Sequence, residues 1–154
     1  MIQRIQSIYL FIAAILTSLI YIFPFAEYLK DGTFYLLDIM GLKNNSTSET
    51  IFSTLPLLLL VSICILIAFA TIFLFNKRTL QIRLCNLNIL LYVILIAGVF
   101  FYSDRVENEL NVESLVTTYK FGSIIPVIGI ILTFLANRAI RKDEALVRAS
   151  DRIR

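Results

Sequence analysis

The chain has 154 residues, of which 58% are hydrophobic and 16% are charged, and its formal net charge is +3. A soluble domain carries about 25% charged residues, so this composition argues against an ordinary soluble fold. Histidine is absent and only two cysteines occur, so we expect no metal site, no haem and no other cofactor.

Four long runs contain no charged residue, and short charged segments separate them: residues 5–26, 50–76, 84–103 and 121–137. Each run is long enough to cross a bilayer core of roughly 30 Å as a helix rising about 1.5 Å per residue. We therefore predict an all-α fold, a four-helix bundle embedded in the membrane. It forms a single domain over residues 1–154, with spans at about 5–25, 51–75, 84–102 and 121–137.

The first predicted span carries small residues in its middle, and Pro24 marks its end. It lacks a convincing cleavage site, so we expect an uncleaved membrane anchor. In the loop that follows, residues 33–40 are too apolar for a free loop and too short to span. We expect a short interfacial or packed element there, with a strand as one alternative.

The third predicted span carries Asn86 and Asn88 near one end. Amides at this depth hydrogen-bond across helices, so we interpret both residues as helix-packing contacts rather than substrate contacts. The loop after this span is acidic and is predicted to be partly helical. Its carboxylates are read as a solvated face: Asp104, Glu107, Glu109 and Glu113.

The fourth predicted span has small residues and one proline at steps of four, three, four and three: Gly122, Pro126, Gly129, Thr133 and Ala136. This spacing places all five on one face of a helix. In a membrane, such a face indicates close packing against another helix, either in the same chain or in a partner.

The tail, residues 138–154, is predicted to continue the fourth span as a basic helix outside the membrane. Its cations are candidates for contact with the inner leaflet or with a partner protein: Arg138, Arg141, Lys142, Arg148 and Arg152. The sequence does not rank these two alternatives.

Charge asymmetry predicts the orientation. The N-terminus, the loop near residue 80 and the tail carry ten of the fourteen basic residues, and the opposite side carries eight of the eleven acidic ones. Because basic segments remain in the cytoplasm, both termini are predicted to be cytoplasmic. The basic charge then indicates anionic lipid as a partner and not nucleic acid.

Both ends of the chain resemble one family of small inner-membrane proteins of Bacteroidota, the domain-of-unknown-function family 4293. The resemblance is specific over residues 1–10, which read MIQRIQSIYL, and over residues 137–154, which read NRAIRKDEALVRASDRIR. It implies a location in the bacterial inner membrane, with the chain crossing several times, and it implies no catalytic residues.

No Asp, Glu, Lys, Arg or His lies within a predicted span, and no catalytic, nucleotide-binding or metal-binding motif occurs. The leading hypothesis is therefore a non-enzymatic accessory subunit of a larger inner-membrane complex, in contact with other integral membrane proteins. It would bind them through the small-residue face of the fourth span and the basic tail. One alternative is a small-solute channel or carrier using Asn86, Asn88, Ser62 and Thr133. Another is a lipid-modifying enzyme using the outer carboxylates.

Overall fold

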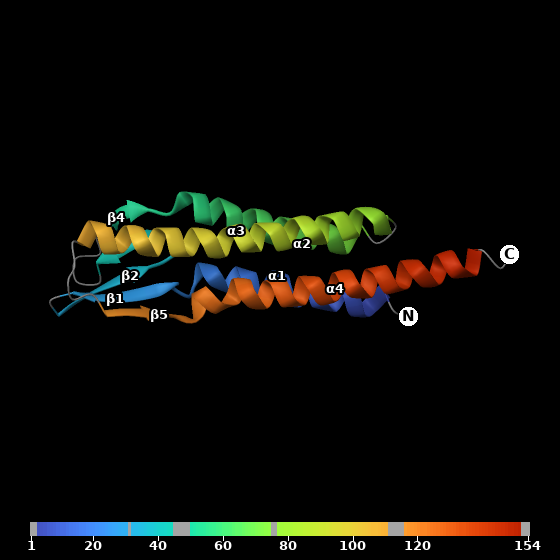
Figure 1. Cartoon of the computed structure of the whole chain (residues 1–154), viewed down its shortest axis with the longest axis horizontal. Coiled ribbons are helices and arrows are strands. Elements are labelled where there is room, and N and C mark those ends of the chain that lie inside the picture. The colour runs from blue at the N-terminus through green and yellow to red at the C-terminus, as the bar shows by residue number, and fades with distance from the viewer. Residues whose placement is uncertain (1–2, 31, 45–49, 75–76, 111–115, 152–154) are drawn as a thin grey trace.

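The structure is a computed structural model that describes residues 3–30, 32–44, 50–74, 77–110 and 116–151. Four helices lie lengthwise beside one another, and a five-stranded sheet lies at one end of them (Figure 1). We call the end that carries the strands the sheet end. The opposite end, with the start of the third helix and the end of the fourth, is the tail end.

The helices are α1 (Gln3–Ser18), α2 (Leu55–Phe73), α3 (Arg78–Leu110) and α4 (Phe121–Asp151), and a short 3-10 turn, η1 (Leu19–Tyr21), continues α1. In α2, α3 and α4, a stretch is long and apolar enough to cross a membrane, whereas α1 with η1 gives a shorter apolar helix. The charge-free runs therefore located the helices, because backbone groups in apolar surroundings are best satisfied within a helix.

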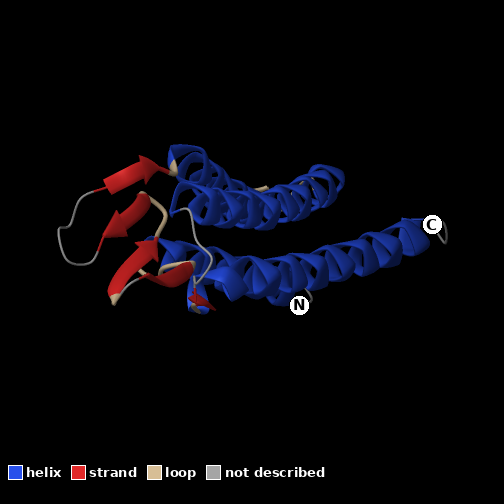
Figure 2. Cartoon of the chain, turned by 60° about the vertical axis from the view of Figure 1, so that its left-hand side comes forward, coloured by secondary structure: helices blue, strands red, loops and turns tan. Residues whose placement is uncertain are grey.

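The predicted all-α fold is wrong. Segments between the helices form an antiparallel sheet of five strands in the order β4-β3-β2-β1-β5. The strands are β1 (Ala26–Lys30), β2 (Thr33–Leu37), β3 (Gly41–Asn44), β4 (Thr50–Ser53) and β5 (Val116–Tyr119). Figure 2 separates these strands from the helices by colour.

The sheet forms because the segments between the helices carry apolar residues that need cover. Ala26 and Tyr28, which alternate along β1, are buried with Leu37, Leu42 and Val106 in one cluster at the sheet end. A helix could not bury such short segments as well, whereas paired strands satisfy their backbone and present one face to the core. The strand alternative for residues 33–40 is thus the correct one for residues 33–37.

Several helix boundaries differ from those of the predicted spans. Residues 50–53 pair as β4, so α2 begins only at Leu55. The third helix continues past residue 102 to Leu110, as the predicted partly helical character of that segment implies, and α4 runs unbroken to Asp151, which confirms the predicted helical continuation of the fourth span through the tail. The charge-free runs therefore marked the apolar part of each helix and not its ends.

The helices form a ring in chain order. The first and third helices each contact both α2 and α4. Successive helices run in opposite directions, so α1 and α3 run toward the sheet end and α2 and α4 run away from it (Figure 1). Separate hydrophobic clusters fill the middle and the tail end of this ring.

Candidate functional site

The small-residue face of α4 is buried along its whole length by the other elements of the chain. A Cβ atom on Gly129 would lie 2.8 Å from Cζ of Tyr92 on α3, and one on Gly122 would collide with the backbone oxygen of Pro24. Both glycines thus permit approaches that no larger residue allows. The face lies inside the bundle and comprises Gly122, Pro126, Gly129, Thr133 and Ala136.

Tyr92 also ties the third helix to the first. Its hydroxyl lies 2.6 Å from Oγ1 of Thr17, and both residues are fully buried. The Thr17 hydroxyl donates its single hydrogen to the carbonyl oxygen of Ala13 at 2.7 Å. The Tyr92 hydroxyl must therefore be the donor to Thr17.

One turn nearer the tail end, two buried polar side chains have no hydrogen-bond partner among the described residues: Asn88 and Thr133. Asn88 precedes Tyr92 by four residues on α3, and Thr133 follows Gly129 by four on α4. Because these helices run in opposite directions and Tyr92 meets Gly129, Asn88 and Thr133 lie at the same level of the bundle. The two side chains thus place polar groups without a described partner at one level of the interior, one turn from the bonded pair of Tyr92 and Thr17.

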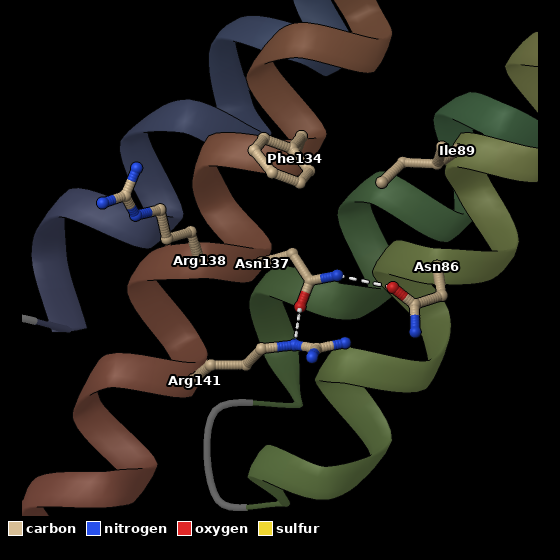
Figure 3. Close-up of a pocket in the computed structure, with 6 residues that line it drawn as sticks. All are labelled: Asn86, Ile89, Phe134, Asn137, Arg138 and Arg141. Atoms are coloured by element: carbon tan, nitrogen blue, oxygen red, sulfur yellow. Dashed lines mark hydrogen bonds between the residues drawn. The ribbon is translucent and has the colours of Figure 1, made fainter.

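An open groove lies between α3 and α4 toward the tail end. It has a volume of about 290 Å³ and is lined by Asn86, Ile89, Phe134, Asn137, Arg138 and Arg141 (Figure 3). We call it the α3–α4 groove. Its walls are chemically divided, because the two apolar side chains lie nearer the sheet end and the amides and Arg141 lie nearer the tail end.

A chain of hydrogen bonds crosses the polar part of this groove. Nδ2 of Asn137 donates to Oδ1 of Asn86 at 2.5 Å, and Nε of Arg141 donates to Oδ1 of Asn137 at 3.1 Å (Figure 3). Asn137 is only 5% exposed, whereas Arg141 is exposed. The buried amide thereby fixes one side of an exposed guanidinium group. Figure 3 also shows Arg138 pointing away from this chain of bonds, on the side of α4 that faces α1.

Beyond the groove, the fourth helix is anchored to the start of the third. Nη2 of Arg78 lies 3.2 Å from Oδ2 of Asp143, and Nη1 donates to the backbone oxygen of Asp143 at 3.3 Å. Past this anchor, the helix projects beyond the other three helices (Figure 1). Leu146 and Val147 are 51% and 42% exposed on the projecting part.

The sheet end is joined to the bundle by polar contacts. The hydroxyls of Tyr28 on β1 and Ser103 on α3 lie 2.7 Å apart, and both residues are buried. Burial raises the pKa of Tyr28 from the ordinary 10.0 to about 12, and the hydrogen bond to Ser103 offsets only part of that rise. Lys120 and Glu27 form an ion pair beside these contacts.

The acidic residues at this end form no metal centre within the described part of the chain, where no group of three or more potential ligands occurs. Asp104, Glu107 and Glu109 are exposed on the last turns of α3. The fourth predicted carboxylate, Glu113, lies outside the described residues.

The predicted site residues thus fall in different places. The groove includes Asn86, Arg138 and Arg141, whereas Asn88 and the small-residue face lie in the interior. The remaining tail cations are Lys142, exposed outside the groove lining; Arg148, within α4; and Arg152, outside the described residues. Their role in lipid or partner binding stays a prediction.

Sequence reasoning missed Asn137 as the partner of Asn86 and Tyr92 as the residue that faces Gly129. A usable signal existed for the first pair, because each asparagine stands near the tail-side end of a charge-free run. No local signal singled out Tyr92, since a tyrosine within an apolar span is ordinary.

Comparison with known proteins gives a family and no activity. No curated protein matches the chain. The family described as domain of unknown function (DUF4293) matches residues 2–153, nearly the whole chain. The protein therefore belongs to that family.

Proposed function

We propose that the protein is a non-enzymatic accessory subunit of a larger complex in the bacterial inner membrane. In this proposal all four helices cross the membrane, the tail end lies in the cytoplasm and the sheet lies outside. The charge distribution supports this orientation, because the basic residues concentrate toward the tail end and the acidic ones toward the sheet end.

The observation that carries the proposal is the projecting, anchored end of α4. Leu146 and Val147 are exposed there among charged residues, beyond the contacts of the bundle. The ion pair of Arg78 with Asp143 holds the helix in a defined direction at its base. An anchored helix with exposed apolar and basic residues is suited to bind a neighbouring protein at the membrane surface.

The burial of the small-residue face moves the proposed partner contact to the tail. Gly129 and Ala136 are already covered inside the bundle, and a partner could reach them only if α4 separated from α3 and α1. We therefore assign the close-packing role of this face to the chain itself.

The test is site-specific photo-crosslinking in native membranes. A photo-reactive residue replaces Leu146 on the projecting helix, and a matched control replaces Leu59, which is exposed on α2 at 61%. The proposal predicts a discrete protein adduct from position 146 and none of the same mass from position 59. The proposal fails if position 146 gives no protein adduct while the photo-reactive residue does form adducts in other membrane proteins of the same cells.

The unpaired interior polar groups favour one alternative, a small-solute channel or carrier. Asn88 and Thr133 could contact a polar solute at mid-bundle. Two other residues predicted for such a path are engaged elsewhere, because Ser62 donates to the Leu58 carbonyl and Asn86 bonds to Asn137. Flux into liposomes that is abolished in an Asn88→Leu, Thr133→Val variant would favour the channel, and flux equal to that of empty liposomes would dismiss it.

A further inference from the structure

In the α3–α4 groove, each amide oxygen already accepts one hydrogen bond, whereas several donors make none to a described residue. Oδ1 of Asn137 accepts from Arg141, and Oδ1 of Asn86 accepts from Asn137. The unused polar atoms of this chain of bonds are Nδ2 of Asn86 and the two Nη atoms of Arg141, for which no described residue provides an acceptor. Asn offers two amide hydrogens and Arg offers five hydrogens in a planar fork, so several hydrogens remain.

These remaining donors share one side of the groove. Figure 3 shows Nδ2 of Asn86 and the Nη atoms of Arg141 on the same side of Asn137, toward the tail end. Donors beside a positive charge match a ligand with several acceptor oxygens and a negative charge. No carboxylate lines the groove, and the nearby Asp143 is paired with Arg78.

The apolar part of the groove adds a second requirement. Ile89 and Phe134 lie one turn nearer the sheet end than the amides, and Phe134 is exposed. The predicted membrane span ends at residue 137, so these apolar walls would lie inside the hydrocarbon and the donors at its boundary. A ligand that satisfies both parts is an amphiphile with an anionic head group.

We propose that the α3–α4 groove binds an anionic phospholipid of the inner leaflet. Its phosphate accepts hydrogen bonds from Arg141 and Asn86, and its acyl chain lies along Phe134 and Ile89. A phosphodiester carries acceptors and a negative charge without donors, which matches the unused groups of the groove. This lipid site rests on the proposed membrane placement, with the tail end at the cytoplasmic surface. It goes beyond the proposed accessory role, because the protein could bind a partner without the lipid and the lipid without a partner.

The experiment uses the full-length purified protein in neutral detergent. Native mass spectrometry measures bound phosphatidylglycerol, with phosphatidylcholine of the same chain length as the zwitterionic comparison. Arg141→Gln removes the charge and the fork, and Asn86→Leu removes one donor without changing charge. The matched control is Arg83→Gln, which removes one exposed positive charge from α3 at the same end, outside the groove.

The wild type should retain phosphatidylglycerol in preference to phosphatidylcholine. Arg141→Gln should weaken phosphatidylglycerol binding by roughly tenfold to a hundredfold, as expected for charged hydrogen bonds, and Asn86→Leu by about fivefold. Arg83→Gln should change it by less than about twofold. Arg141→Lys, which keeps the charge and loses the fork, should fall between the wild type and Arg141→Gln.

Three results would overturn the proposal. One is an equal loss in Arg83→Gln and Arg141→Gln, which would indicate general surface attraction. Another is equal binding of both lipids by the wild type. The third is displacement of the lipid by millimolar sodium phosphate, which would assign the groove to a soluble anion. Since the purified protein carries no partner, each of these outcomes leaves the accessory role untouched.

Discussion

At the scale of single residues, Tyr92 joins three helices. Its ring lies against Gly129 on α4, and its hydroxyl donates to Thr17 on α1. Replacing Gly129 with leucine would push a branched side chain into that ring. Overpacking of this kind costs about 1 to 3 kcal/mol, so the thermal midpoint of the detergent-solubilised protein should fall by several degrees. Val127→Leu, at an exposed position of the same helix, should leave the thermal midpoint unchanged. A midpoint for Gly129→Leu equal to that of the wild type would contradict the close packing of Gly129 against Tyr92.

The two asparagines of α3 should respond oppositely to replacement by leucine. Asn88 is buried without a described partner, so Asn88→Leu should leave stability unchanged or raise it by about 1 kcal/mol. Asn86→Leu breaks the bond to Asn137 and should lower stability by roughly 0.6 to 2 kcal/mol. Chemical unfolding in mixed micelles measures both values, and a larger loss for Asn88→Leu than for Asn86→Leu would reverse the assignment.

Tyr28 makes the sheet end sensitive to alkaline pH. Its folded pKa, about 12, lies above the ordinary value of 10.0, so the folded state holds the proton more tightly. The resulting stabilisation is complete below pH 10 and is lost as the pH rises from about 10 to about 12.

A pKa difference of about two between the folded and the unfolded state corresponds to about 2 to 3 kcal/mol of stability. A Tyr28→Phe, Ser103→Ala variant, which removes both buried hydroxyls, should therefore lose less stability than the wild type between pH 9 and pH 12. Tyr119→Phe, at an exposed tyrosine of the same sheet, is the control and should behave as the wild type. If melting curves show that all three proteins lose the same stability between pH 9 and pH 12, Tyr28 does not titrate as stated.

At the scale of elements, the helices were predictable and the sheet was not. The helices follow from apolar runs, a local property of the sequence. The sheet depends on pairing between distant segments, since β1 lies between β2 and β5 and pairs Tyr28 with Thr117. Strands of four or five residues with mixed polarity carry too weak a pattern to reveal that pairing.

The candidate site was predictable to a similar degree. Asn86, Arg138 and Arg141 could be named from the sequence, because amides and cations at span ends are conspicuous. The groove that these residues share could not be predicted. Its prediction requires knowing that α3 and α4 are neighbours and that residue 86 lies level with residue 137.

The ion pair between Arg78 and Asp143 should fix the direction of the projecting part of α4. Asp143→Asn removes the charge pair and should increase the mobility of a spin label at position 146, read by electron paramagnetic resonance. A label at the exposed position 127, far from the pair on the same helix, should not change. The effect of Asp143→Asn on global stability should stay below about 1 kcal/mol, as for other partly exposed ion pairs. An unchanged spectrum at position 146 would assign the direction of α4 to other contacts.

At the scale of the whole molecule, the chain divides into a packed interior and two differently charged ends. The interior holds the small-residue face and the bond of Tyr92 to Thr17, both of which serve the fold. Among the described residues, the two features for which we propose binding roles, the α3–α4 groove and the projecting end of α4, both lie toward the tail end, whereas the exposed carboxylates of α3 lie at the sheet end. This arrangement favours binding at one membrane surface over transport through the bundle.

The most direct test of the accessory role is the size and composition of the native particle. The protein, extracted from its own membranes in mild detergent, should migrate as a complex larger than its 17.6 kDa chain, with one recurrent membrane protein in constant ratio. A Leu146→Glu, Val147→Glu variant should lose that protein, whereas Leu66→Ala on the exposed face of α2 should retain it. A wild-type protein that migrates alone, with lipid but no protein in constant ratio, would contradict the accessory role.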